Sequence, residues 1–166
     1  MKKIFLFLTI LVQTMLFTAC GPSGEQALTY NDAIVDEQKL IMNKLNNFFE
    51  ALSKPEDVAG IDNSLAAAQQ QVAAGIAIVE KMDGFDGSTT LRDAALELFK
   101  TYQTVLNNEL KTVAENYKLP ADKYDDAMKT ASDKAYDEAL QKMDQALAKM
   151  EAEQKAFMEN YKLEVK

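Results

Sequence analysis

The spacing of apolar residues along the chain predicts four amphipathic helices. In residues 34–52, 58–82, 91–117 and 120–161, apolar side chains recur at steps of three and four, which is the period of a helix and not of a strand. Short breaks separate these segments at Lys54-Pro55, at residues 83–88 and at Lys118-Leu119-Pro120. Proline disfavours helical angles in the residue before it, and glycine commonly follows a helix end. The breaks therefore mark the predicted ends of helices.

The apolar stripes define the predicted core. They comprise Ile34, Val35, Ile41, Met42, Leu45, Phe48, Phe49 and Leu52 in the first segment, Val58, Ile61, Leu65, Ala68, Val72, Ile76, Val79 and Met82 in the second, Leu91, Ala95, Leu98, Tyr102, Val105, Leu106, Leu110, Val113 and Tyr117 in the third, and Tyr136, Leu140, Met143, Leu147, Met150, Phe157 and Tyr161 in the fourth. Gln38 and Gln154 interrupt two stripes, and we expect each to fix helix register or to bond a neighbouring backbone group.

Four stripes joined by links too short for crossovers predict an all-α, up-down-up-down four-helix bundle with a long C-terminal helix. The fourth stripe has the spacing of a coiled-coil-like seam. At about 1.5 Å per residue its segment would run roughly 60 Å, longer than the other three. We therefore expect either that its end projects from the bundle or that it bends near residues 130–133.

The first twenty residues have the form of a secretory signal. Lys2 and Lys3 precede an apolar run over residues 4–17, which Thr18-Ala19 and then Cys20 follow. A charged start, a short apolar segment and a small residue before the cleavage position predict a signal peptide over residues 1–19 that is cut before Cys20.

The residues Phe17-Thr18-Ala19-Cys20 are similar to the bacterial lipobox, in which an apolar residue and two small residues precede a cysteine. Phe17 stands where leucine is usual, so the alternative is a simple secretory signal that leaves a free thiol. Because the one cysteine of the chain stands where the modification needs it, we predict a lipoprotein in which Cys20 carries acyl chains such as palmitate. Residues 20–26 are then the lipidated cysteine and a tether rich in Gly, Pro and Ser, and residues 27–166 form the bundle domain.

Cleavage makes the chain more acidic. Loss of Lys2 and Lys3 lowers the number of basic residues from 18 to 16 against 26 acids, so the net charge changes from −8 to −10. This balance argues against nucleic-acid binding. The chain has no histidine, which di-iron and haem-binding bundles require, so we predict no metal and no cofactor. Met143 and Met150 could bind a soft metal, but both lie in the fourth stripe, and we assign them to the core.

Two groups of residues suggest a binding site, and each has a plainer interpretation. Asp83 and Asp86 flank glycines as in a calcium loop, but the alternating acids of an EF-hand are absent, so a turn is expected. Five tyrosines could line a groove for a sugar or a peptide, whereas the plainer interpretation is core with hydroxyls at the rim. These candidate groove residues are Tyr30, Tyr102, Tyr117, Tyr136 and Tyr161.

Three segments carry a resemblance to a known family. They are YNDAIVDEQ at residues 30–38, FDG at 85–87 followed by LRDAAL at 91–96, and QKAFMENY at 154–161. Together they resemble an uncharacterised family of bacterial surface lipoproteins found in Bacteroidetes and in spirochaetes. The resemblance implies a lipid-anchored helical protein with no assigned activity, and hence no catalytic residue to carry over.

These features favour a non-enzymatic interaction or structural module, anchored to the bacterial outer membrane through acylated Cys20 and binding an unknown envelope protein or ligand. Both the cell surface and the periplasmic face fit the sequence. The alternative is a periplasmic or surface binding protein, a chaperone or a small-ligand carrier, that uses a groove in the bundle. An enzyme is disfavoured because adjacent acids such as Asp36-Glu37 point about 100° apart on a helix, and no convergent set for proton transfer is evident.

Overall fold

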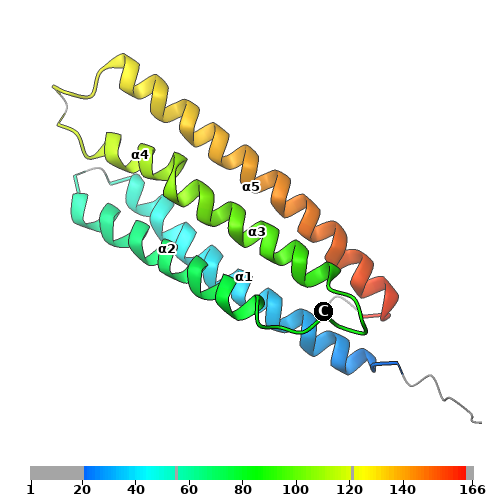
Figure 1. Cartoon of the computed structure of the whole chain (residues 1–166). Helices are drawn as coiled ribbons and strands as arrows, with labels where there is room; N and C mark the ends of the chain where they lie inside the picture. Colours follow the sequence, from blue (N-terminus) through cyan, green and yellow to red (C-terminus); the bar gives the residue numbers. More distant parts are fainter. Residues whose placement is uncertain (1–20, 55, 121, 164–166) are drawn as a thin grey trace, which may run out of the picture.

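The computed structural model describes residues 21–54, 56–120 and 122–163. Within these ranges the chain forms five helices, α1 (Gly24–Leu52), α2 (Val58–Val79), α3 (Thr90–Asn107), α4 (Glu109–Tyr117) and α5 (Asp126–Asn160) (Figure 1). The predicted signal peptide and the predicted lipidation site, Cys20, lie outside the described residues.

The helices run alternately up and down the long axis of one bundle, except that α4 continues in the direction of α3 (Figure 1). α1 packs against α2, α2 against α3, and both α3 and α4 against α5. Figure 1 shows the start of α1, the loop between α2 and α3, and the end of α5 together at one end of the bundle. The predicted all-α, up-down-up-down bundle is confirmed, and its last helix, with 35 residues, is the longest.

The first helix begins inside the segment that the sequence assigned to the tether, residues 20–26. The hydroxyl of Ser23 accepts a hydrogen bond from the Gln26 amide at 3.2 Å, and the Gln26 side chain accepts one from the Ser23 amide at 2.8 Å. This reciprocal capping box satisfies two backbone donors of the first turn. The helix therefore starts at Gly24, three residues before the predicted boundary.

The third predicted helix, residues 91–117, is divided into α3 and α4 at Asn108. Asn108 has φ −120° and ψ −84°, outside the helical region. Its amide still bonds to the Thr104 carbonyl at 3.1 Å, and its own carbonyl accepts the Thr112 amide at 3.0 Å, so the rod changes direction without losing these bonds. Asn107 and Asn108 have low helix propensity because their side chains compete for backbone hydrogen bonds. α3 and α4 thus form one interrupted rod of the bundle.

The fourth predicted helix, residues 120–161, starts later than expected, at Asp126. The Asp125 carboxylate caps it by accepting the Met128 amide at 2.8 Å, which satisfies a free donor of the first turn. α5 then continues without a break to Asn160, over about 52 Å at 1.5 Å per residue. Residues 126–131 are all exposed, and Ser132 is the first buried residue of the helix. Of the two expectations for this helix, a projecting end agrees with this exposure.

Most residues of the predicted stripes lie in the core or pack against it, but some positions differ. Val58 is 42% exposed because it is the first residue of α2, directly after the capping residue Asp57. On α5, Ala139 and Ala146 are buried, whereas the leucines next to them in sequence are only half-buried. Small alanine side chains let α5 lie close to α3 and α4, and the stripe prediction missed them because it followed the larger residues.

A glycine lies where three helices converge. A Cβ added at Gly75 of α2 would lie 2.9 Å from Cδ1 of Ile41 on α1 and 3.5 Å from Cε2 of Phe99 on α3. Both of these side chains are completely buried. Ile41 and Phe99 therefore occupy the space that the absent side chain of Gly75 leaves free.

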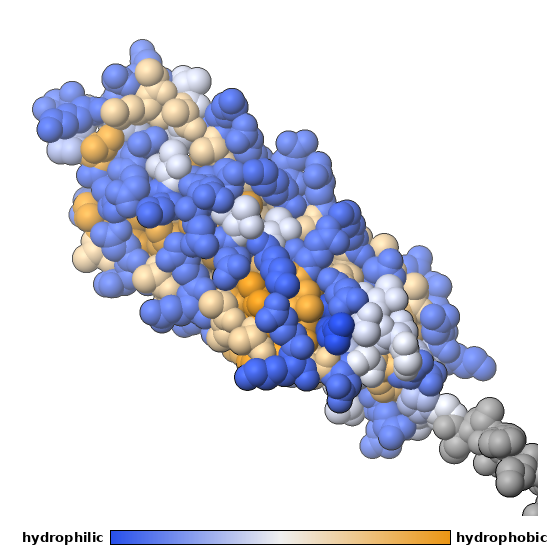
Figure 2. Space-filling model, in the orientation of Figure 1, coloured by the Kyte–Doolittle hydropathy of each residue, from blue (hydrophilic) through white to orange (hydrophobic). Residues whose placement is uncertain are grey.

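Figure 2 shows a largely hydrophilic face with hydrophobic colour gathered over α2. α2 carries one charged residue, Asp62, and its Ile78 is 47% exposed. Across the described ranges, no helix combines the length and the apolar character needed to cross a bilayer.

We expect the substitution Gly75→Leu to lower the free energy of unfolding by about 1–3 kcal/mol, because the added side chain overpacks the space between Ile41 and Phe99. The matched control is Ala77→Leu, at an exposed position of the same helix, which should change stability by no more than about 0.5 kcal/mol. Urea denaturation followed by circular dichroism measures both. Equal effects in the two variants would contradict the close approach at Gly75.

Candidate functional site

Four aromatic rings meet at the end of the bundle where α1 begins, and we call them the aromatic cluster. Tyr30 comes from α1, Phe85 from the α2–α3 loop, Phe157 from α5, and Tyr161 from the position directly after α5. The Phe85 ring lies 5.1 Å from that of Tyr30, 5.4 Å from that of Phe157 and 5.1 Å from that of Tyr161, measured between centroids. These separations and the tilted or edge-on orientations are typical of favourable aromatic pairs.

A tight turn holds Phe85 in this cluster. The backbones of Phe85 and Ser88 exchange two hydrogen bonds, of 2.8 and 2.9 Å. Between them Asp86 and Gly87 have φ angles of 51° and 77°, and two consecutive left-handed residues make a type I′ turn, for which Asp-Gly is a preferred sequence. The turn expected around Asp83 and Asp86 is confirmed.

Both tyrosine hydroxyls of the aromatic cluster hold this loop in place. The Tyr30 hydroxyl donates to the Asp83 carbonyl at 3.0 Å, and the Tyr161 hydroxyl donates to Oδ2 of Asp86 at 3.1 Å. Burial raises the pKa of Tyr30, and loss of solvent followed by the hydrogen bond to Asp86 raises the pKa of Tyr161. Both rings are therefore neutral hydrogen-bond donors at physiological pH.

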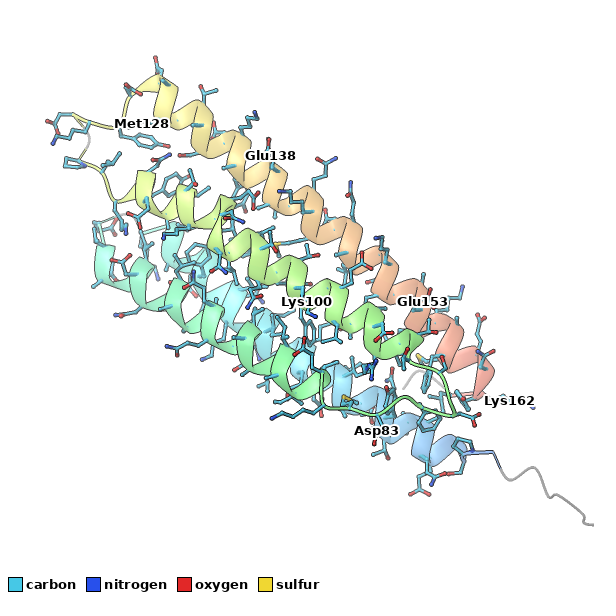
Figure 3. The ribbon with its side chains drawn as sticks, viewed as in Figure 1. Asp83, Lys100, Met128, Glu138, Glu153 and Lys162 are labelled. Carbon is cyan, nitrogen blue, oxygen red and sulfur yellow. The ribbon has the colours of Figure 1, made fainter. Side chains whose placement is uncertain are left out.

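A cleft of about 260 Å³, which we call the end cleft, lies beside the aromatic cluster. Its lining is completed by Ser88, Thr90, Leu91, Glu153, Ala156 and Asn160. Glu153 is the one charged residue of this lining, and Figure 3 shows it on α5 beside the start of α3. The Glu153 side chain is half-buried and forms no ion pair within residues 21–54, 56–120 and 122–163. The end cleft thus combines aromatic walls, neutral polar groups and a single negative charge.

Wider and shallower grooves follow the outer surface between α5 and the α3–α4 rod. One of them, of about 690 Å³, is lined by carboxylates and lysines together, including Glu97, Lys142 and Lys149. Lys149 pairs with Glu97, and Lys142 pairs with Glu109, so ion pairs cross from α5 to the rod. Because both signs of charge are present and paired, these grooves point to no single class of ligand.

The five tyrosines predicted as groove residues are not brought together in one place. Tyr30 and Tyr161 belong to the aromatic cluster. Tyr102 is 1% exposed in the core, and burial raises its pKa to about 12, with a smaller contribution from the negative charges of Asp144 and Glu151. The other two lie toward the opposite end of the bundle, where the Tyr117 ring is 6.1 Å from that of Tyr124 and the Tyr136 ring is 6.0 Å from that of Phe49.

The side chains that the sequence reading missed are Phe85, Phe157 and Glu153. Phe157 was assigned only to the fourth stripe, and Glu153 lies beside that stripe on α5. One signal was present for Phe85, because Asp86-Gly87 is a turn sequence that fixes the direction of the preceding side chain.

The two stripe glutamines have different surroundings. Gln154 donates from Nε2 to Oδ1 of Asn31 at 2.9 Å, and Asn31 is only 6% exposed. This bond joins α5 to α1 through side chains, so it fixes their relative register without using a backbone group. Gln38 is half-buried on α1. Met143 and Met150 are buried in the core, as predicted.

Metal-binding groups do not gather in the part of the chain that the structure describes: no three side chains of His, Cys, Asp or Glu come together there. Comparison with protein-family models, with curated proteins and with solved structures finds no match for the chain. The resemblance to the bacterial lipoprotein family stays a prediction. The functional proposals below therefore depend on the sequence and on the geometry of the bundle.

We expect Gln154→Ala to lower the free energy of unfolding by about 1–3 kcal/mol, because it leaves the buried Oδ1 of Asn31 without its partner. The double variant Asn31→Leu/Gln154→Leu should be less destabilised, since it removes both polar groups. Gln141→Ala, at an exposed position of α5, is the control and should be nearly silent. Chemical denaturation of the four proteins tests this, and a silent Gln154→Ala would contradict the role of the pair.

The raised pKa of Tyr102 predicts a loss of stability at alkaline pH. Below about pH 10 the phenol is neutral in both the folded and the unfolded state. Between about pH 10 and 12 the unfolded state ionises first, so the free energy of unfolding should fall by about 2–3 kcal/mol through this group.

Tyr102→Phe should remove this part of the decrease in the free energy of unfolding at alkaline pH. Tyr124→Phe, at a half-buried position, should leave the decrease in place. Urea denaturation at a series of pH values measures the difference. An unchanged alkaline loss in Tyr102→Phe would show that the Tyr102 phenol is not the group responsible.

Proposed function

We propose that the protein is a lipid-anchored, non-enzymatic interaction or structural module of the bacterial envelope, held to the outer membrane by acylated Cys20. The position of Cys20 carries the proposal. It is the one cysteine of the chain, it follows Phe17-Thr18-Ala19, and it stands three residues before Ser23, which caps α1. A lipidated residue at this position would be joined to the bundle almost directly.

The short connection supports a defined orientation. Because the helix starts at Gly24, residues 20–23 can span at most about 14 Å when extended. A Cβ added at Gly21 would lie 4.0 Å from Oδ2 of Asp86, and one at Gly24 would lie 3.5 Å from the Tyr161 carbonyl. The first described residues therefore run beside the aromatic cluster. A bundle anchored at Cys20 would hold this end, with the end cleft, near the lipid surface, on either the periplasmic or the external face.

The composition of the end cleft supports a role in binding and not in catalysis. Glu153 is its only charged residue, and its lining holds no lysine, cysteine or histidine. Acid–base catalysis requires a proton donor or acceptor placed against a second functional group. The lining around Glu153 holds aromatic and aliphatic side chains, an amide, two aliphatic hydroxyls and two phenols, and both phenols already donate to the α2–α3 loop. A small-ligand carrier is the second candidate function, which the aromatic and polar lining of the end cleft favours.

Metabolic labelling with an alkyne-bearing palmitate in a bacterial host tests the anchor. We expect the protein to incorporate the label and to fractionate with membranes, and the Cys20→Ser variant to lose both properties. The double variant Cys20→Ser/Ser53→Cys keeps one thiol at an exposed position and should also stay unlabelled. A cleaved, unlabelled protein with a free thiol at Cys20 would contradict the proposal. If the protein turned over an envelope substrate and one carboxylate substitution abolished that turnover, the non-enzymatic part of the proposal would be contradicted.

A further inference from the structure

We propose that the end cleft binds a compact organic cation, an ammonium group carried either by a phospholipid headgroup or by a small free amine. This inference rests on the proposed interaction function and gives it a ligand class. It does not require that Cys20 be acylated, because the end cleft is made by residues of the bundle alone. Three features of the end cleft carry it: its aromatic walls, its single charge and its size.

The aromatic walls favour a cation. The faces of aromatic rings carry partial negative charge and attract Lys, Arg or ligand ammonium groups within about 6 Å of the ring centroid. The rings of the aromatic cluster contact one another, with the closest centroids, those of Phe157 and Tyr161, 4.8 Å apart. A ligand therefore lies beside the cluster and not among its four rings. All four rings are half-buried, so each keeps some exposed surface.

The charge of the lining of the end cleft also favours a cationic ligand. A half-buried carboxylate at Glu153 faces a lining without any cationic side chain, so an anionic ligand would be repelled and a cation would be attracted. The positive end of the α3 dipole lies nearby, but the first turn of α3 already holds a carboxylate. Asp93 accepts a hydrogen bond from the Thr89 hydroxyl at 2.6 Å and pairs with Arg92 at 2.9 Å. Glu153 also lines a neighbouring groove with Lys149, but Lys149 pairs with Glu97, so no cationic side chain of the described residues pairs with Glu153.

The size of the end cleft limits the ligand. A volume of about 260 Å³ is just below the range of roughly 300–1,000 Å³ that is usual for ligand pockets. A quaternary or primary ammonium on a short hydroxylated chain fits such a space. Ser88, Thr90 and Asn160 can bond to a hydroxyl or ester oxygen next to the ammonium group.

Calorimetric titration of the full chain, purified as the cell makes it, tests the proposal with choline as the probe. Its neutral isostere, in which a tert-butyl group replaces the trimethylammonium group, separates charge from shape. We expect choline to bind at least tenfold more tightly than the isostere. Equal affinity for the two molecules, preference for a neutral monosaccharide, or no binding of choline would each overturn the proposal.

Variants assign the binding to the end cleft. Glu153→Gln should weaken choline binding at least tenfold and leave binding of the isostere unchanged. Glu151→Gln removes the same charge from an exposed position two residues away and should bind choline as the parent does. Phe85→Leu, checked for folding by circular dichroism, should also weaken choline binding. An unchanged affinity for choline in Glu153→Gln would overturn the assignment of the cation site to the end cleft, even if choline binds elsewhere.

Competition distinguishes the source of the ammonium group. Displacement of choline by phosphatidylethanolamine vesicles, and not by phosphatidylglycerol vesicles, supports a lipid headgroup. Displacement by soluble ethanolamine with no effect of either vesicle supports a free amine. Displacement by phosphatidylglycerol alone would overturn the cation proposal. Because palmitate labelling of Cys20 is measured separately, failure of the cation site and failure of the anchor give different results.

Discussion

The contact among four aromatic rings joins parts of the chain that are distant in sequence, because it brings together α1, the α2–α3 loop and the end of α5. α1 packs on α2, and α5 packs on α3 and α4, so the first and last helices meet mainly through long side chains. The Tyr30 and Phe157 rings, 5.9 Å apart, and the bond from Gln154 to Asn31 join α1 to α5 at one end. Toward the other end, contact between the Phe49 ring of α1 and the Tyr136 ring of α5 also joins these two helices. These contacts thus join α1 to α5 at both ends of the bundle.

The same contact explains how a simple bundle acquires a cleft. The type I′ turn fixes Phe85, and the hydroxyls of Tyr30 and Tyr161 hold the loop from two sides. Because the rings fill the centre of this end, space remains only beside them, against α5 and the start of α3. Glu153 lies in that space as the one charged group. The side chains that join α1, the loop and α5 thus also form the wall of the end cleft, so a ligand would meet an ordered surface.

Much of the fold could be predicted from the sequence because the buried residues of a helix recur at steps of three and four. The apolar stripes predicted the core and the topology. The helix ends depend on local hydrogen bonds, which the spacing of apolar residues does not predict. The Ser23–Gln26 capping box moved the start of α1 into the predicted tether, and the non-helical angles of Asn108 divided the third helix. The end cleft was harder to foresee, because α1, a loop and α5 each contribute residues. Tyr30 and Tyr161 were among the candidates. Tyr102, Tyr117 and Tyr136 were candidates too, but they also belonged to the apolar stripes, and the stripes could not show which stripe tyrosines would meet at one end.

We propose that the aromatic end of the bundle is the part that recognises a ligand. The most direct measurement is a nuclear magnetic resonance titration of the isotopically labelled protein with choline, which follows every assigned backbone amide at once. We expect the shifts to concentrate in residues 85–91 and 153–161, while residues 117–136 at the opposite end stay unchanged. Shifts confined to residues 117–136, or spread evenly over all helices, would contradict it.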